Sequence, residues 1–75
     1  MRDTVAPRRA QKLIESGLKL VSRGKIQEAR NHFKLSAEQY LTADSLTYWG
    51  WMEHRLGNTE LAIRLCQQAI ERDPE

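Results

Sequence analysis

Cysteine is almost missing from this 75-residue chain, in which Cys66 is the only one. A lone cysteine excludes a disulfide within the chain and fits a reducing compartment. Long apolar runs are missing too, since no segment approaches the roughly 18 residues that a membrane span requires. The segment from Met1 to Ala10 contains arginines with no apolar stretch behind them, unlike a secretory signal. We therefore expect a cytoplasmic protein with no membrane segment.

Catalytic and metal-binding patterns are also lacking. His32, His54 and Cys66 include no pair at a metal-ligand spacing such as His-x-x-x-His. No nucleophile, base and orienting group are arranged together, and no glycine-rich phosphate loop is present. We expect no metal, no cofactor, no small-molecule substrate and no enzymatic activity.

Charge is nearly balanced, with a formal net charge of +2. The basic side chains gather in residues 1–25, which carry a net charge of +5 and leave −3 for the rest of the chain. A basic segment of this kind can meet nucleic acid or an acidic peptide, but it is more often plain solvated surface. No aromatic residues lie among Arg8, Arg9 and Lys12, which disfavours nucleic acid as the partner.

The two halves of the chain share an offset of 33 residues. Small or apolar residues coincide at this offset in the pairs Ala10/Ala43, Leu13/Leu46, Gly17/Gly50, Gly24/Gly57 and Ala29/Ala62. Leu20 falls against Glu53 and breaks the pattern. A fixed period between about 20 and 50 residues is typical of stacked supersecondary units.

Start and stop signals predict two helices in the second half. Asp44 or Ser45 can cap the first of them, and Gly57 can end it in a left-handed conformation. Asn58 can cap the next helix, whose apolar residues recur at helical spacing until Pro74.

The first half follows the same plan. Pro7 can occupy the first turn of a helix, Gly24 breaks that helix, and apolar residues from Ile26 to Leu41 mark the next one. We therefore predict an all-α fold of four antiparallel helices, in two helix-turn-helix repeats stacked as a short right-handed solenoid. The predicted organisation is a single domain over 1–75, with residues 1–6 frayed, repeat one over 7–42 and repeat two over 43–75.

A combined motif is spread over nearly the whole chain. In the second half it consists of Leu46, Trp49-Gly50, Gly57, Ala62, Cys66, Ala69 and Asp73-Pro74, and in the first half of Leu13, Gly17, Gly24, Ala29 and Phe33. This motif resembles the tetratricopeptide repeat (TPR) family, and the chain looks like a bacterial-type TPR protein or a fragment of one. It departs from the family at Ser16, Ser36 and Leu41, and its period is 33 where about 34 is usual.

The resemblance implies an adaptor or scaffold that binds a peptide or helix of another protein in a concave groove, lined by the first helix of each repeat. The groove positions carried over by alignment are Gln11, Ile14, Leu18, Val21 and Ser22 in the first repeat and Asp44, Thr47, Trp51, His54 and Arg55 in the second, with Tyr48 beside them. One subset of the family grips a C-terminal carboxylate with lysines and asparagines, but Ile14 and Leu18 occupy two of those positions here. We therefore expect an apolar partner, with Trp51 and Tyr48 as anchors, because such residues are enriched at binding hot spots.

Other interpretations stay open at this point. Stacking of the two repeats can bury Trp49 and Trp51 as ordinary core. The family usually ends with an extra polar helix, which covers the stacking face of the last repeat. No such helix follows Pro74, so we expect either a longer natural protein or a homodimer that hides Leu61, Leu65 and Ile70. Nucleic-acid binding through the basic N-terminal helix is the least favoured alternative.

Overall fold

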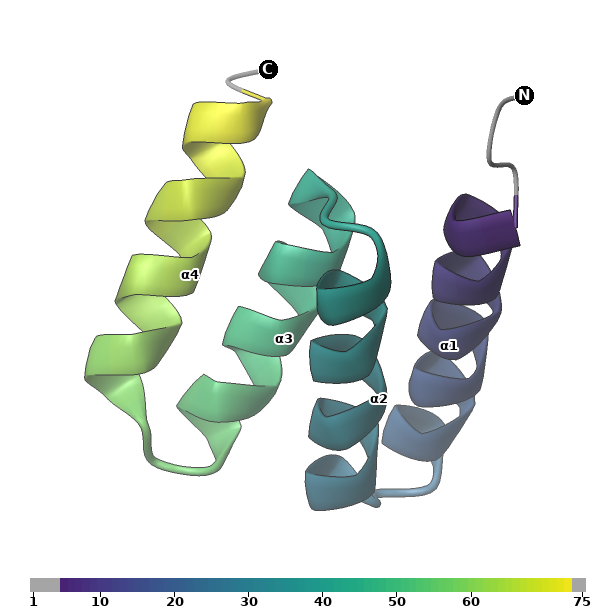
Figure 1. Cartoon of the computed structure of the whole chain (residues 1–75). Helices are drawn as coiled ribbons and strands as arrows, with labels where there is room; N and C mark the ends of the chain where they lie inside the picture. Colours follow the sequence, from purple (N-terminus) through teal and green to yellow (C-terminus); the bar gives the residue numbers. More distant parts are fainter. Residues whose placement is uncertain (1–4, 74–75) are drawn as a thin grey trace.

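Four helices make up the computed structural model, which describes residues 5–73. They are α1 (Val5–Ser22), α2 (Ile26–Gln39), α3 (Ala43–Arg55) and α4 (Thr59–Arg72). Successive helices run in opposite directions, so the start of α1 and the end of α4 lie at the same end of the molecule (Figure 1). The described residues contain no strand. The predicted all-α fold is confirmed.

The helices pack as two neighbouring hairpins. α1 packs against α2, α3 packs against α4, and α2 packs against α3 where the two hairpins meet (Figure 1). This order agrees with two helix-turn-helix units at the 33-residue offset. The right-handed sense of their stacking stays a prediction.

Glycine makes the tight turn inside each hairpin. Gly24 and Gly57 have φ values of 77° and 93°, in the left-handed region that side chains disfavour. The amides after them reach back to the helix, because Lys25 N donates to the Leu20 carbonyl at 2.9 Å and Asn58 N to the Glu53 carbonyl at 2.8 Å. Both turns therefore end the preceding helix with the same glycine-dependent hydrogen bonds.

Two helix starts differ from the sequence prediction. The N-cap of α3 is Thr42, which forms a capping box with Ser45, whereas we predicted Asp44 or Ser45 as the cap. Asn58 occupies the N-cap position of α4, as predicted, although its side chain makes no cap bond and its Nδ2 donates to Glu53. α1 begins at Val5, so residues 5 and 6 are helical where we expected a frayed end; residues 1–4 lie outside the described part.

Phe33 is the centre of the core in the first hairpin. Its side chain is fully buried and clusters with Ile14, Ala29 and Met52. A Cβ atom placed on Gly17 would lie 2.5 Å from the Phe33 ring, so the close approach of α1 to α2 requires glycine there. Met52 belongs to α3, and this core therefore joins the two hairpins.

The second hairpin has its own smaller core of Leu46, Leu65 and Ala69. Trp49 packs against both this cluster and the cluster around Phe33. The side chain of Trp49 is therefore structural, as the sequence indicated.

A buried carboxylate, Glu53, stands in the apolar position that Leu20 holds in the first unit. It is 2% exposed and accepts hydrogen bonds from Asn58 Nδ2 at 2.7 Å, Trp49 Nε1 at 2.9 Å and Arg30 Nη1 at 3.1 Å. Burial by itself raises the pKa of Glu53, but these donors and the charge of Arg30 outweigh it and hold the pKa below its ordinary value. The network ties α2, α3 and the α3–α4 turn together.

Candidate protein-interaction surface

The predicted groove residues divide into a buried and an exposed set. Ile14 is only 6% exposed, in the Phe33 cluster, so its side chain is not available to a partner. Val21 and Tyr48 are half-buried and pack against the same cluster. Thr47 is half-buried, and its hydroxyl donates to the Ala43 carbonyl. The exposed members are Gln11, Leu18, Ser22, Asp44, Trp51, His54 and Arg55.

Trp51 is exposed, which decides between the two interpretations of this residue. Its exposed fraction is 56%, and its ring meets Tyr48 edge-on with the centroids 5.6 Å apart. Tyr48 in turn stacks on the buried Phe33 ring at 5.2 Å. A row of three aromatic rings thus runs from the core to the surface, where more than half of the outermost side chain, Trp51, is exposed.

An apolar hollow beside Trp51 forms a groove between α3 and α4, with a volume of about 380 Å³. We call it the α3/α4 groove. It is lined by Gly50, Trp51, His54, Thr59, Ala62, Ile63, Cys66, Gln67 and Ile70. Ile63 and Ile70 are 52% and 61% exposed, so large apolar side chains stand beside a floor of small ones. An apolar hollow of this kind can take up apolar side chains of another molecule.

Sequence reasoning assigned the exposed face of the last helix only in part. We expected Leu61, Leu65 and Ile70 to be exposed there. Ile70 is exposed, but Leu65 is 4% exposed and Leu61 is half-buried, because both pack towards α3. The sequence prediction did not include Ile63 among the exposed residues of this helix. The 33-residue offset could have found it, because the residue at the same position in the first unit is the charged Arg30.

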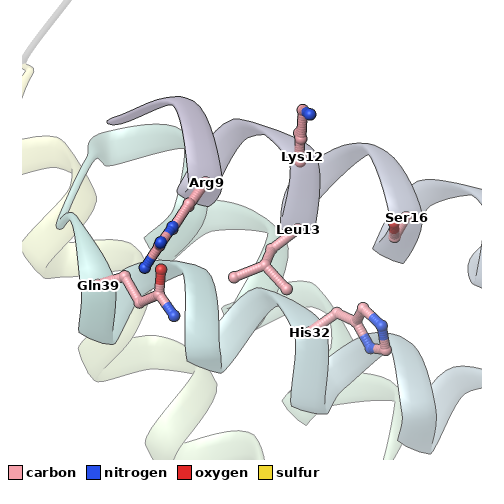
Figure 2. A pocket seen from close by; sticks show the side chains of 6 residues that line it. All are labelled: Arg9, Lys12, Leu13, Ser16, His32 and Gln39. Atoms are coloured by element: carbon pink, nitrogen blue, oxygen red, sulfur yellow. The ribbon is translucent and has the colours of Figure 1, made fainter. Parts of the chain in front are cut away.

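A second hollow, of about 300 Å³, lies between α1 and α2 and bears on the nucleic-acid alternative. It is lined by Arg9, Lys12, Leu13, Ser16, His32 and Gln39. Figure 2 shows Arg9 reaching towards Gln39, whereas Lys12 points away from the helix pair. His32 Nδ1 lies 2.9 Å from the Glu28 carbonyl. The cationic side chains here do not converge on one point, as they would to hold a phosphate.

The sequence matches no protein-family model, and neither a curated protein nor a solved structure is significantly similar to it. The likeness to the tetratricopeptide repeat therefore rests on the motif residues themselves. Within residues 5–73, no helix is both long and apolar enough to cross a membrane. The same residues hold no cluster of His, Cys, Asp or Glu side chains that could bind a metal ion.

Proposed function

We propose that this chain is a non-catalytic adaptor of the tetratricopeptide-repeat type, which binds a peptide or helix of another cytoplasmic protein through apolar side chains around Trp51. The observation that carries the proposal is the exposed indole of Trp51, supported from below by Tyr48 and Phe33. An indole already packed edge-on against Tyr48 has less conformational entropy to lose when a partner covers it. Tryptophan is also among the residues most enriched at binding hot spots.

Leu18 extends the proposed binding face to the first unit. It stands 33 residues before Trp51, at the same place in its own unit, and is 41% exposed. His54 and Arg55 are exposed near the end of α3 and can orient an acidic group of the partner. The lone cysteine favours a reducing compartment, which is why the proposal places the protein in the cytoplasm.

The test is a selection of random 16-residue peptides displayed on phage, with the intact chain as the target. We expect enriched peptides that contain spaced apolar residues and lose at least about tenfold in affinity against Trp51→Ala, the loss expected at a hot spot. Lys34→Ala, which changes an exposed residue on α2, is the matched control and should not affect binding. Failure to enrich any peptide that depends on Trp51 would refute the proposal.

A further inference from the structure

We infer that the α3/α4 groove binds one amphipathic helix of the partner protein, in the way that the first hairpin already holds α3. This inference rests on the proposed function and names both the exact place and the form of the ligand. It comes from a comparison of the two units at the 33-residue offset, because the first unit shows a helix in place on its own surface.

The contacts of α3 with the first unit provide the template. Met52 is buried in the cluster that contains Ile14 and Ala29, and Tyr48 stacks on Phe33. On the same side of α3, Glu53 pairs with Arg30 of α2 at 3.1 Å. The first unit therefore holds a helix through two large side chains four residues apart and one ion pair.

The second unit presents the equivalent surface without a helix on it. Ala29, Arg30, Phe33 and Ala37 of the first unit correspond to Ala62, Ile63, Cys66 and Ile70, and all four of the latter line the α3/α4 groove. The phenyl ring of Phe33 is replaced by the thiol of Cys66, which leaves room above the floor, and the guanidinium of Arg30 is replaced by the sec-butyl side chain of Ile63. The groove therefore has the place for a helix and a more apolar wall than the template.

These replacements define the chemistry of the occupant. Where α3 presents Tyr48, the partner helix needs a large apolar side chain that fills the space above Cys66. Where α3 presents Glu53, the partner needs an apolar side chain against Ile63, because a buried carboxylate would have no cation to pair with there. The expected motif is thus a helix with large apolar residues at i, i+4 and i+5.

The first helix of a second copy does not fit this description. The residues of α1 that correspond to Tyr48, Met52 and Glu53 are Glu15, Lys19 and Leu20. Glu15 and Lys19 are exposed and charged, and Leu20 already packs against the Phe33 cluster, so α1 does not offer these three apolar side chains to another copy. We therefore take the occupant to be a helix of the partner protein that the proposed function requires.

The experiment uses a stapled helical peptide with the sequence of residues 42–55 carrying Glu53→Leu, labelled with fluorescein, and the intact chain. Fluorescence anisotropy should show saturable binding that weakens at least about tenfold with Ile63→Asp, as for a lost apolar anchor. Ile63 is half exposed, so this variant should keep its helical circular dichroism. A control peptide that also carries Met52→Asp should not bind. Lys34→Ala in the chain, which changes an exposed residue of α2, should leave the affinity unchanged.

Cys66 reports directly whether the groove is occupied. It is the only cysteine, it lines the groove, and it is half-buried, so iodoacetamide can reach it in the free chain. Saturating peptide should slow its alkylation by at least about tenfold, since a helix over the floor excludes the reagent in proportion to its occupancy.

Three results would overturn the inference. The first is peptide binding that leaves the alkylation of Cys66 unchanged. The second is a dimer that Ile63→Asp converts to a monomer, because a second copy would then be the occupant. The third is no binding of the stapled peptide while phage-selected peptides bind and depend on Leu18 but not on Ile63. That third result would leave the proposed function standing and place the binding site on the side of Trp51 that faces Leu18.

Discussion

Replacing Glu53 by alanine should destabilise the fold more than any other single loss of charge. The carboxylate is buried and accepts three hydrogen bonds, each worth about 1.5–3 kcal/mol when one partner is charged. Part of this is offset by the cost of burying the charge, and removal of one member of a buried pair typically costs about 3–5 kcal/mol. Arg30 is 23% exposed and can regain water, so we expect the lower end, about 3 kcal/mol.

The assay is urea unfolding and thermal unfolding at pH 7, each followed by circular dichroism. For a domain of this size a loss of about 3 kcal/mol corresponds to a melting temperature lower by roughly 12–24 °C. Glu15→Ala is the control, because Glu15 is an exposed glutamate in the middle of α1, and its replacement should change stability by less than about 0.5 kcal/mol.

The pH dependence gives a second, independent readout. Because the pKa of Glu53 is lower in the folded state, its carboxylate stabilises the fold fully above the pKa of the unfolded chain. That contribution is lost as the pH falls through the lower, folded-state pKa. The pH range in which the stability is lost therefore lies below about pH 4.3. The stability gap between wild type and Glu53→Ala should therefore narrow from pH 7 to pH 3. A gap under about 1 kcal/mol at pH 7, or a gap that does not change with pH, would refute the reasoning.

Four further substitutions test the packing. Gly17→Ala should destabilise by about 1–3 kcal/mol in thermal melts, because its Cβ would overlap the Phe33 ring; an unchanged melting temperature would contradict that contact. Gly50→Leu and Ala62→Leu should each lower the unfolding free energy by about 1–3 kcal/mol, because a Cβ added at Gly50 would lie only 3.3 Å from the Ala62 carbonyl oxygen. Unaltered urea midpoints for both variants would show that α3 and α4 pack less closely than this. Trp51→Ala should stay within about 1 kcal/mol of wild type, since Trp51 is mostly exposed; unfolding by this change would make it a core residue.

The helices and their order could be predicted because each is marked by a local signal. Gly24 and Gly57 end α1 and α3 with the left-handed conformation that glycine tolerates best, and the shared offset of 33 residues places the two hairpins in equivalent positions. Capping was harder to predict, because Thr42, Asp44 and Ser45 are all competent caps and only the path of the chain after α2 selects Thr42.

The surface could be predicted less well, because exposure depends on which neighbour covers a helix face. Ile14 and Leu18 lie one helical turn apart on α1, yet only Ile14 belongs to the buried cluster around Phe33. Glu53 was noticed only as a break in the repeat, since the cation that pairs with it lies 23 residues away on another helix. Long-range pairings of this kind have no local sequence signal.

The central claim, that Trp51 is the anchor for a protein partner, can be tested on the indole N–H signals of the two tryptophans. The chain, labelled with ¹⁵N, would be titrated with the tightest phage-selected peptide in two-dimensional NMR. Trp49 Nε1–H is bonded to Glu53 inside the fold, whereas the Trp51 side chain is mostly exposed. We predict that the Trp51 indole signal shifts until the peptide saturates and that the Trp49 signal stays in place. A saturated complex in which the Trp51 signal has not moved would contradict the account.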